Sequence, residues 1–246
     1  MVSYRNPPVI EAVCEFRFPQ DTQWPKDIAD QLYEKVKDAF PHKVIHKVQE
    51  LEITAKEDKI GHKIIPIERV TLQSEKPRIQ LHIGNRILSI HCLQPYPSWA
   101  VFLPSIQMAF NTIQKITTIT GIDRIGLLYL DKIEIPQDGG SLSEYFNFHP
   151  FLGEKLPKDF VNFIVGCEFP YANMRDICRL QLTRGIQERH GHSTFILSTD
   201  YYLAKRQMIS HEEVDEWLEN AHREVREIFE GSITDKMRTC FELEGN

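Results

Sequence analysis

Residues 6–19 read Asn6-Pro7-Pro8-Val9-Ile10-Glu11-Ala12-Val13-Cys14-Glu15-Phe16-Arg17-Phe18-Pro19 and carry the clearest structural signal in the chain. Apolar and polar residues alternate, as in a strand with one face on a hydrophobic core and the other in water. Proline cannot donate a backbone hydrogen bond to a sheet, so the prolines at both ends mark the limits of pairing. We predict a strand whose core side carries Ile10, Ala12, Cys14, Phe16 and Phe18 and whose solvent side carries Glu11, Glu15 and Arg17.

The length and the cysteine content indicate a globular protein of a reducing compartment. A chain of 246 residues forms one large or two small domains and buries roughly 70% of its unfolded surface. The five cysteines are scattered and form no Cys-x-x-Cys pair, which is typical of reduced packing residues. The sequence shows no charged and apolar leader, and no apolar run approaches the roughly 20 residues of a membrane span. We therefore expect a cytoplasmic protein that does not enter the membrane.

The negative charge is concentrated near the C-terminus. Residues 211–230 contain eight carboxylates and two arginines, which accounts for the whole net charge of −6 and leaves the rest of the chain neutral. A neutral body lacks the basic stripe that neutralises phosphates, so we do not expect nucleic-acid binding.

The first 137 residues predict a mixture of strands and helices. An apolar residue at every fourth position predicts a helix over residues 26–40. Gly84-Asn85 predicts a hairpin turn in which glycine supplies a positive φ. A second helix begins near Ser98 and ends at Gly121, with a kink or a short preceding turn expected at Pro104. The predicted strands cover residues 44–53, 68–73, 78–83, 86–93 and 122–136, with a loop or long hairpin over residues 54–66.

The rest of the chain predicts three strands followed by a helix. The strands cover residues 160–169, 177–186 and 193–203, and the helix begins at Ser210, which is spaced from Glu213 as a capping box. We place an N-terminal α+β half at residues 1–137, an aromatic connector at 138–159 and a C-terminal β-β-β-α half at 160–246. The fold class is α+β, with antiparallel sheets and helices packed on one face. Because Cys14-Glu15-Phe16 recurs as Cys167-Glu168-Phe169, the two halves are candidates for a duplication.

Four stretches of the chain form a recognisable set of motifs. They are Asn6-Pro7-Pro8-x-x-Glu11-Ala12-Val13, Tyr96-x-x-Trp99, residues 124–129 leading to Ile135-Pro136, and Trp217-Leu218-x-x-Ala221-His222 with Phe229 and Ile233-Thr234. Together they resemble an uncharacterised, sporadically distributed family of bacterial and archaeal proteins of similar length. The resemblance implies no activity, cofactor or ligand. The distribution of the family is typical of an accessory or antitoxin-like role in a mobile or defence-related locus.

Two histidine patterns are open to a functional interpretation, but both are better explained without one. Arg184 and His190 have the Arg-x5-His spacing of a family of helical ribonucleases, but they flank glycines between predicted strands, which favours a solvated hairpin tip. His211 and His222 share a helix face with Asp215, but eleven residues of helix separate the imidazoles by roughly 16 Å, too far for one metal ion. We therefore assign no catalytic residue, no metal ligand and no cofactor.

We take the candidate binding residues from the motif positions. We take the candidate partner-facing residues from the acidic helix and from the aromatic connector. A buried ion pair between Glu11 and Arg124 is one hypothesis for the strand residues. The candidate binding residues are Glu11, Arg124, Tyr129 and His222, and the candidate partner-facing residues are Glu212, Glu216, Glu219, Glu227, Phe146 and Phe148.

The absence of catalytic motifs favours a non-catalytic interaction protein, as a homo-oligomer or as a subunit of a complex. The alternative is an enzyme or sensor that binds a small ligand or a nucleotide between the two halves, because pockets concentrate at such interfaces. A deep polar pocket with histidine and acidic groups of shifted pKa would favour this alternative.

Overall fold

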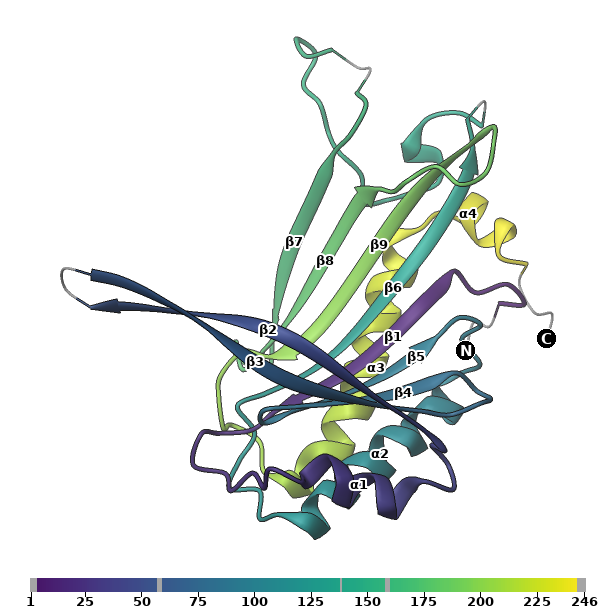
Figure 1. Ribbon diagram of the computed structural model, residues 1–246. Coiled ribbons are helices and arrows are strands. Elements are labelled where there is room, and N and C mark those ends of the chain that lie inside the picture. Colours follow the sequence, from purple (N-terminus) through teal and green to yellow (C-terminus); the bar gives the residue numbers. More distant parts are fainter. Residues whose placement is uncertain (1–3, 57–58, 138, 158–159, 243–246) are drawn as a thin grey trace.

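The computed structural model describes residues 4–56, 59–137, 139–157 and 160–242. Within them, nine strands form one antiparallel sheet in the order β2-β3-β4-β5-β1-β6-β9-β8-β7 (Figure 1). The strands are β1 (Val9–Arg17), β2 (His42–Lys56), β3 (Lys59–Gln73), β4 (Ile79–Gly84), β5 (Ile87–Leu93), β6 (Arg124–Pro136), β7 (Ile164–Tyr171), β8 (Asp176–Arg184) and β9 (His192–Leu203).

The helices lie on one face of this sheet (Figure 1). Helix α1 (Ile28–Val36) packs on α2 (Trp99–Ile116), α2 contacts β4 and β5, and α3 (Val214–Ser232) contacts β6, β8 and β9. A short α4 (Asp235–Cys240) follows α3. The predicted α+β class is confirmed, but the described strands form one antiparallel sheet and not the separate sheets that were predicted. No described helix has the length and apolar character to cross a membrane.

The two predicted halves contribute to the same sheet. Strand β6 from the first half pairs with β9 from the second over eleven residue positions, from Gly126 opposite Tyr202 to Pro136 opposite His192. The repeated Cys-Glu-Phe triplets occupy different environments, since Cys14 is buried in a central strand and Cys167 is exposed in the edge strand β7. The structure does not show a duplication, and the boundaries of the halves remain a prediction.

Part of the aromatic connector belongs to the core, although Phe151 is 91% exposed. Phe146 is fully buried and lies edge-on to Phe195, with ring centroids 5.6 Å apart, in a second hydrophobic cluster between the sheet and α4. Phe148 is half-buried against the same cluster. The assignment of Phe146 as partner-facing is therefore wrong, because its ring is needed to cover the inner end of β9.

Several local predictions are confirmed and one turn differs in detail. The Ser210–Glu213 capping box is present, with the Ser210 amide 2.7 Å from the Glu213 carboxylate. Of the predicted loop or long hairpin over residues 54–66, residues 54–56 and 59–66 pair in the β2–β3 hairpin, and residues 57–58 lie outside the described residues. The β4–β5 turn also forms, but its positive φ of 57° belongs to Arg86 and not to Gly84. Pro104 lies inside α2.

A β-bulge changes the predicted facing of the first strand. The β1–β6 register shifts between Val9, which opposes Asp131, and Glu11, which opposes Leu130. The extra residue, Ile10, moves Val9 to the helix-covered side, where it packs on the core in the place expected for Ile10. The bulge thus brings Val9 and the preceding prolines next to Asp131.

A buried hydrogen-bond network holds α3 on the sheet. The carboxylate of Asp176, which is fully buried, accepts hydrogen bonds from Trp217 Nε1 at 3.1 Å and from the Tyr201 hydroxyl at 3.2 Å. Arg175 donates to the same carboxylate at 2.7 Å and 3.1 Å. A buried carboxylate stabilises a fold only when such partners compensate its lost hydration, so this network specifies where α3 docks.

Removal of the Tyr201 hydroxyl tests the network. We predict that Tyr201→Phe lowers the free energy of unfolding by about 1.5 kcal/mol, because a hydrogen bond to a buried charge is lost. The matched control is Tyr202→Phe, whose ring lies on the open face of the sheet against Arg124. It should change stability by less than about 0.5 kcal/mol. Equal losses in urea denaturation would contradict the assigned role of Asp176.

Candidate functional site

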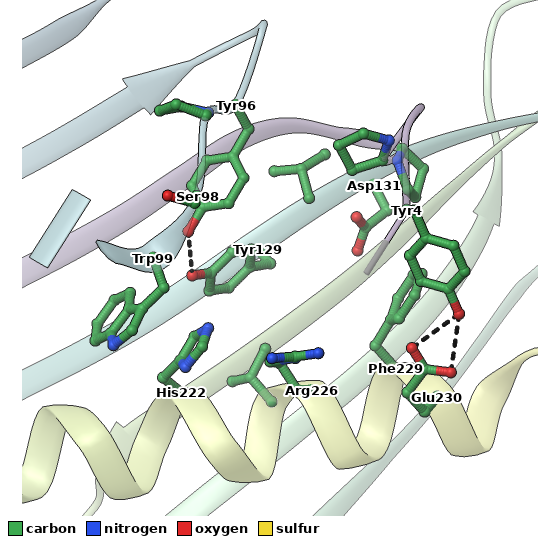
Figure 2. A pocket seen from close by; sticks show the side chains of 15 residues that line it. Tyr4, Tyr96, Ser98, Trp99, Tyr129, Asp131, His222, Arg226, Phe229 and Glu230 are labelled. Carbon is green, nitrogen blue, oxygen red and sulfur yellow. Dashed lines mark hydrogen bonds between the residues drawn. The ribbon is translucent and has the colours of Figure 1, made fainter. Parts of the chain in front are cut away.

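Two of the candidate binding residues, Tyr129 and His222, line one cavity between the sheet and α3 (Figure 2). The cavity has a volume of about 350 Å³. All four stretches that carry the family resemblance contribute to its wall, although they are far apart in the chain. The contributing residues from these stretches are Pro7, Pro8, Tyr96, Trp99, Tyr129, His222 and Phe229.

Aromatic side chains form most of the wall and are held by specific contacts. The hydroxyls of Tyr96 and Tyr129 are 2.9 Å apart and hydrogen-bonded, and their rings meet edge to face. The Trp99 ring stacks on the His222 imidazole, with centroids 4.3 Å apart and planes inclined by 4°. The Trp99 indole also donates a 3.1 Å hydrogen bond to Glu219. The wall is therefore preorganised by its own contacts.

Helix α3 supplies the floor of the cavity through its regular spacing. The lining positions recur at intervals of three and four residues, so they share one face of the helix, beside the apolar stripe that packs on the sheet. Figure 2 shows His222 and Arg226 rising from α3 toward the strands. The lining residues of α3 are His222, Val225, Arg226, Phe229 and Glu230.

The N-terminal segment closes the far end of the cavity. The Tyr4 hydroxyl donates to the Glu230 carboxylate, at 2.9 Å and 3.0 Å from its two oxygens, and the Tyr4 ring packs on Phe241. Arg238 also donates to Glu230, at 3.0 Å. The Glu230 charge is thus compensated within the protein.

Asp131 is the unusual group in this site. It is 2% exposed, and Figure 2 shows its carboxyl aimed into the space between β6 and α3. No hydrogen bond or ion pair from any described residue reaches this carboxyl, whereas buried carboxylates are normally paired. Asp131 is therefore buried without a hydrogen-bond donor from the described residues, and it lies beside the β-bulge of the neighbouring strand β1.

Burial leaves both titratable groups of the cavity centre uncharged at neutral pH. Loss of hydration raises the pKa of Asp131 to about 8. Loss of hydration, with a smaller contribution from the Arg226 charge, lowers the pKa of His222 to about 4. Burial also raises the pKa of both Tyr96 and Tyr129. A shifted pKa in a cavity is typical of a functional site.

The other two candidate binding residues lie on the open face of the sheet. Glu11 contacts His91, with 2.7 Å between Oε1 and Nδ1, and Arg124 bridges Glu15 at 3.4 Å and Asp200 at 3.1 Å. The hypothesised Glu11–Arg124 pair is wrong, because the antiparallel register separates the two residues by most of the length of β1. Arg124 instead borders an open polar cleft shared with Arg17, Arg86 and Arg206.

The remaining sequence candidates do not converge on a site. The four acidic candidates are exposed on α3 or on the turn before it, and among them only Glu219 touches the cavity wall, through Trp99. His190 is exposed in the β8–β9 turn. Within the described ranges no cluster of three or more histidine, cysteine, aspartate or glutamate side chains has the geometry of a metal site. The exposed acidic candidates are Glu212, Glu216, Glu219 and Glu227.

Comparison with known proteins does not add to the description of this cavity. No protein-family profile matches the chain, and no curated protein matches it. The site therefore stands on its own geometry.

Two central residues were not among the sequence candidates. Asp131 was visible as a carboxylate that interrupts the apolar side of a strand, and Arg226 follows His222 by four positions on the same helix face. These signals become a site only when β6 and α3 are brought together.

The shifted pKa of Asp131 predicts a specific pH dependence of stability. Between its ordinary pKa of 3.8 and about 8, the carboxyl ionises in the unfolded chain but not in the folded protein, so rising pH favours unfolding. Asp131→Asn removes this penalty. We predict that the substitution raises the free energy of unfolding by about 2 kcal/mol or more at pH 8, which corresponds to roughly 4 to 8 °C in Tm. This gain should shrink as the pH falls toward 4.

The control for this prediction is Asp38→Asn, which removes an exposed carboxylate. It should leave the pH profile of thermal unfolding unchanged. A Tm difference between the wild type and Asp131→Asn that stays constant across the pH range contradicts the assignment of a buried, uncharged Asp131.

Proposed function

We propose that the protein is a small-molecule-binding protein, a sensor or carrier whose ligand occupies the cavity between β6 and α3. The observation that carries the proposal is the unpartnered Asp131 carboxyl at the cavity wall. A buried polar group without a partner costs folding free energy, and such a group is retained where a ligand supplies the missing contact.

The form of the cavity supports the same function. Its volume of about 350 Å³ falls in the usual range of ligand pockets, and its wall combines aromatic rings with a few converging polar groups. The wall groups are fixed by contacts such as the Tyr96–Tyr129 hydrogen bond and the Trp99–His222 stack. A ligand therefore finds an ordered site, which reduces the entropic cost of binding.

Binding without chemistry fits this geometry better than catalysis. The hydrogen bond between lining residues at the cavity centre joins two tyrosine hydroxyls whose pKa values are raised, so neither is activated as a nucleophile. His222 is held by stacking on Trp99. This arrangement supports recognition of a ligand rather than proton transfer to it.

Obstruction of the cavity tests the proposal. Ser98 lines the cavity and makes no side-chain capping bond to α2, so Ser98→Tyr places a large side chain at the cavity wall without the loss of a cap. We predict that at least one class in a panel of amines, carboxylates, nucleotides and divalent metals raises Tm. A ligand at 100 times its Kd stabilises by roughly 2.7 kcal/mol, which corresponds to roughly 5 to 10 °C.

The stabilisation should disappear in Ser98→Tyr and persist in Ser143→Tyr, an exposed position outside the cavity. A panel without effect, or an effect that Ser98→Tyr leaves intact, would contradict a ligand function for this cavity.

A second candidate function, self-association, is favoured by the free edge of the sheet. Strand β7 is an edge strand, and an exposed backbone edge is a template for pairing with another chain. Large apolar side chains are exposed along it, with Ile164 at 71% and the preceding Val161 at 90%. We propose that a second copy of β7 pairs here antiparallel, and that the acidic residues of α3 remain available to a basic partner.

Light scattering on protein eluted from a size-exclusion column tests the self-association. We predict a dimer in which Ile164→Lys restores the monomer, because a lysine on the edge opposes strand pairing. Ile186→Lys is the matched control, since Ile186 is 86% exposed but lies in the β8–β9 connection. A monomeric wild type at high micromolar concentration contradicts this second candidate.

A further inference from the structure

An ionised Asp131 has no partner in direct contact with it among the described residues. The charged residues that line the cavity are Asp131, Glu230 and Arg226. Glu230 receives hydrogen bonds from Tyr4 and Arg238, whereas no described residue donates a hydrogen bond to Asp131 or forms an ion pair with it. Asp131 is therefore the carboxylate that needs a partner from outside the protein.

The surroundings of Asp131 are suited to a cation. Aromatic rings present a negative face that attracts ammonium groups, and the attraction increases where water is excluded. His222 is uncharged because its pKa is lowered to about 4, so it does not repel a cation at neutral pH. The rings that line the cavity belong to Tyr4, Tyr96, Trp99, Tyr129 and Phe229.

We infer that the ligand of this cavity is an organic cation, a protonated primary amine on an apolar body whose ammonium group binds the Asp131 carboxylate. The inference rests on the proposed ligand-binding function of the same cavity and names its ligand class. The apolar body lies among the aromatic rings, while the ammonium supplies the hydrogen-bond donors that the protein itself does not provide.

Binding exchanges a proton for the cation. The free protein holds Asp131 as a carboxylic acid, and the incoming ammonium group pairs with the carboxylate, so one proton leaves for solvent as one cation enters. This exchange leaves the net charge of the cavity unchanged. Affinity therefore rises with pH up to the pKa of the free carboxyl, about 8.

The other groups that face Asp131 do not produce this dependence. The pKa of His222 is lowered to about 4, and the pKa values of Tyr4, Tyr96 and Tyr129 are raised. These four groups therefore stay uncharged between about pH 6 and about pH 8. The groups that face the carboxyl are Tyr4 from the N-terminal segment, Tyr96 from the segment before α2, Tyr129 from β6, and His222, Arg226 and Glu230 from α3.

Calorimetric titration with benzylamine and its longer homologue phenethylamine tests the inference. Benzyl alcohol and benzoate serve as the neutral and the anionic probe. We expect the affinity for an amine to rise about tenfold for each pH unit between about pH 6 and about pH 8, with release of one proton. Asp131→Asn should weaken amine binding at least tenfold and abolish the pH dependence, whereas Asp38→Asn should change neither.

The outcomes separate this inference from the function on which it rests. If benzyl alcohol or benzoate binds in a manner that Ser98→Tyr blocks, and neither amine binds, the cation assignment is overturned and the ligand-binding proposal stands. Amine binding that Asp131→Asn leaves unchanged also overturns it. The ligand-binding proposal fails separately, when the thermal-shift panel gives no stabilisation that Ser98→Tyr removes.

Discussion

The burial of one carboxyl group, Asp131, is the constraint on which this account depends. A carboxyl sealed between a sheet and a helix, with no donor from the described residues, stays protonated at neutral pH at a cost in stability. Asp176 shows the usual solution in the same protein, since its carboxylate is equally buried but is held by Trp217, Tyr201 and Arg175. Asp176 is therefore the anchor that holds α3 on the sheet, whereas Asp131 belongs to the proposed ligand site.

The anchor and the site are connected through α3. The Asp176 network fixes the N-terminal part of the helix on β8 and β9, and the helical repeat then carries His222 and Arg226 to the cavity above β6. On the opposite wall, the bulge at Ile10 turns Val9 and the preceding prolines toward Asp131. The cavity therefore forms where the lining face of α3, the bulge of β1 and the buried Asp131 of β6 meet.

Local features of the fold could be predicted from the sequence, but the arrangement of the site could not. The period of the strands and helices, the Ser210–Glu213 capping box and the α+β class depend on neighbouring residues, and these predictions hold. The bulge at Ile10, the burial of Phe146 and the lack of a partner for Asp131 depend on contacts between distant segments. No sequence pattern predicts which strand lies beside β1. Tyr129 and His222 could therefore each be predicted as a candidate binding residue, but not as two walls of one cavity.

The most direct measurement is the carboxyl carbon chemical shift of Asp131, followed by nuclear magnetic resonance across the pH range in isotopically labelled protein. The account predicts a midpoint near 8 in the free protein, because burial disfavours the charged form. It also predicts a lower midpoint when an amine saturates the cavity, because the ammonium stabilises the carboxylate. A midpoint near the ordinary value of 3.8 in the free protein would contradict the account, since the carboxyl would then already have a partner.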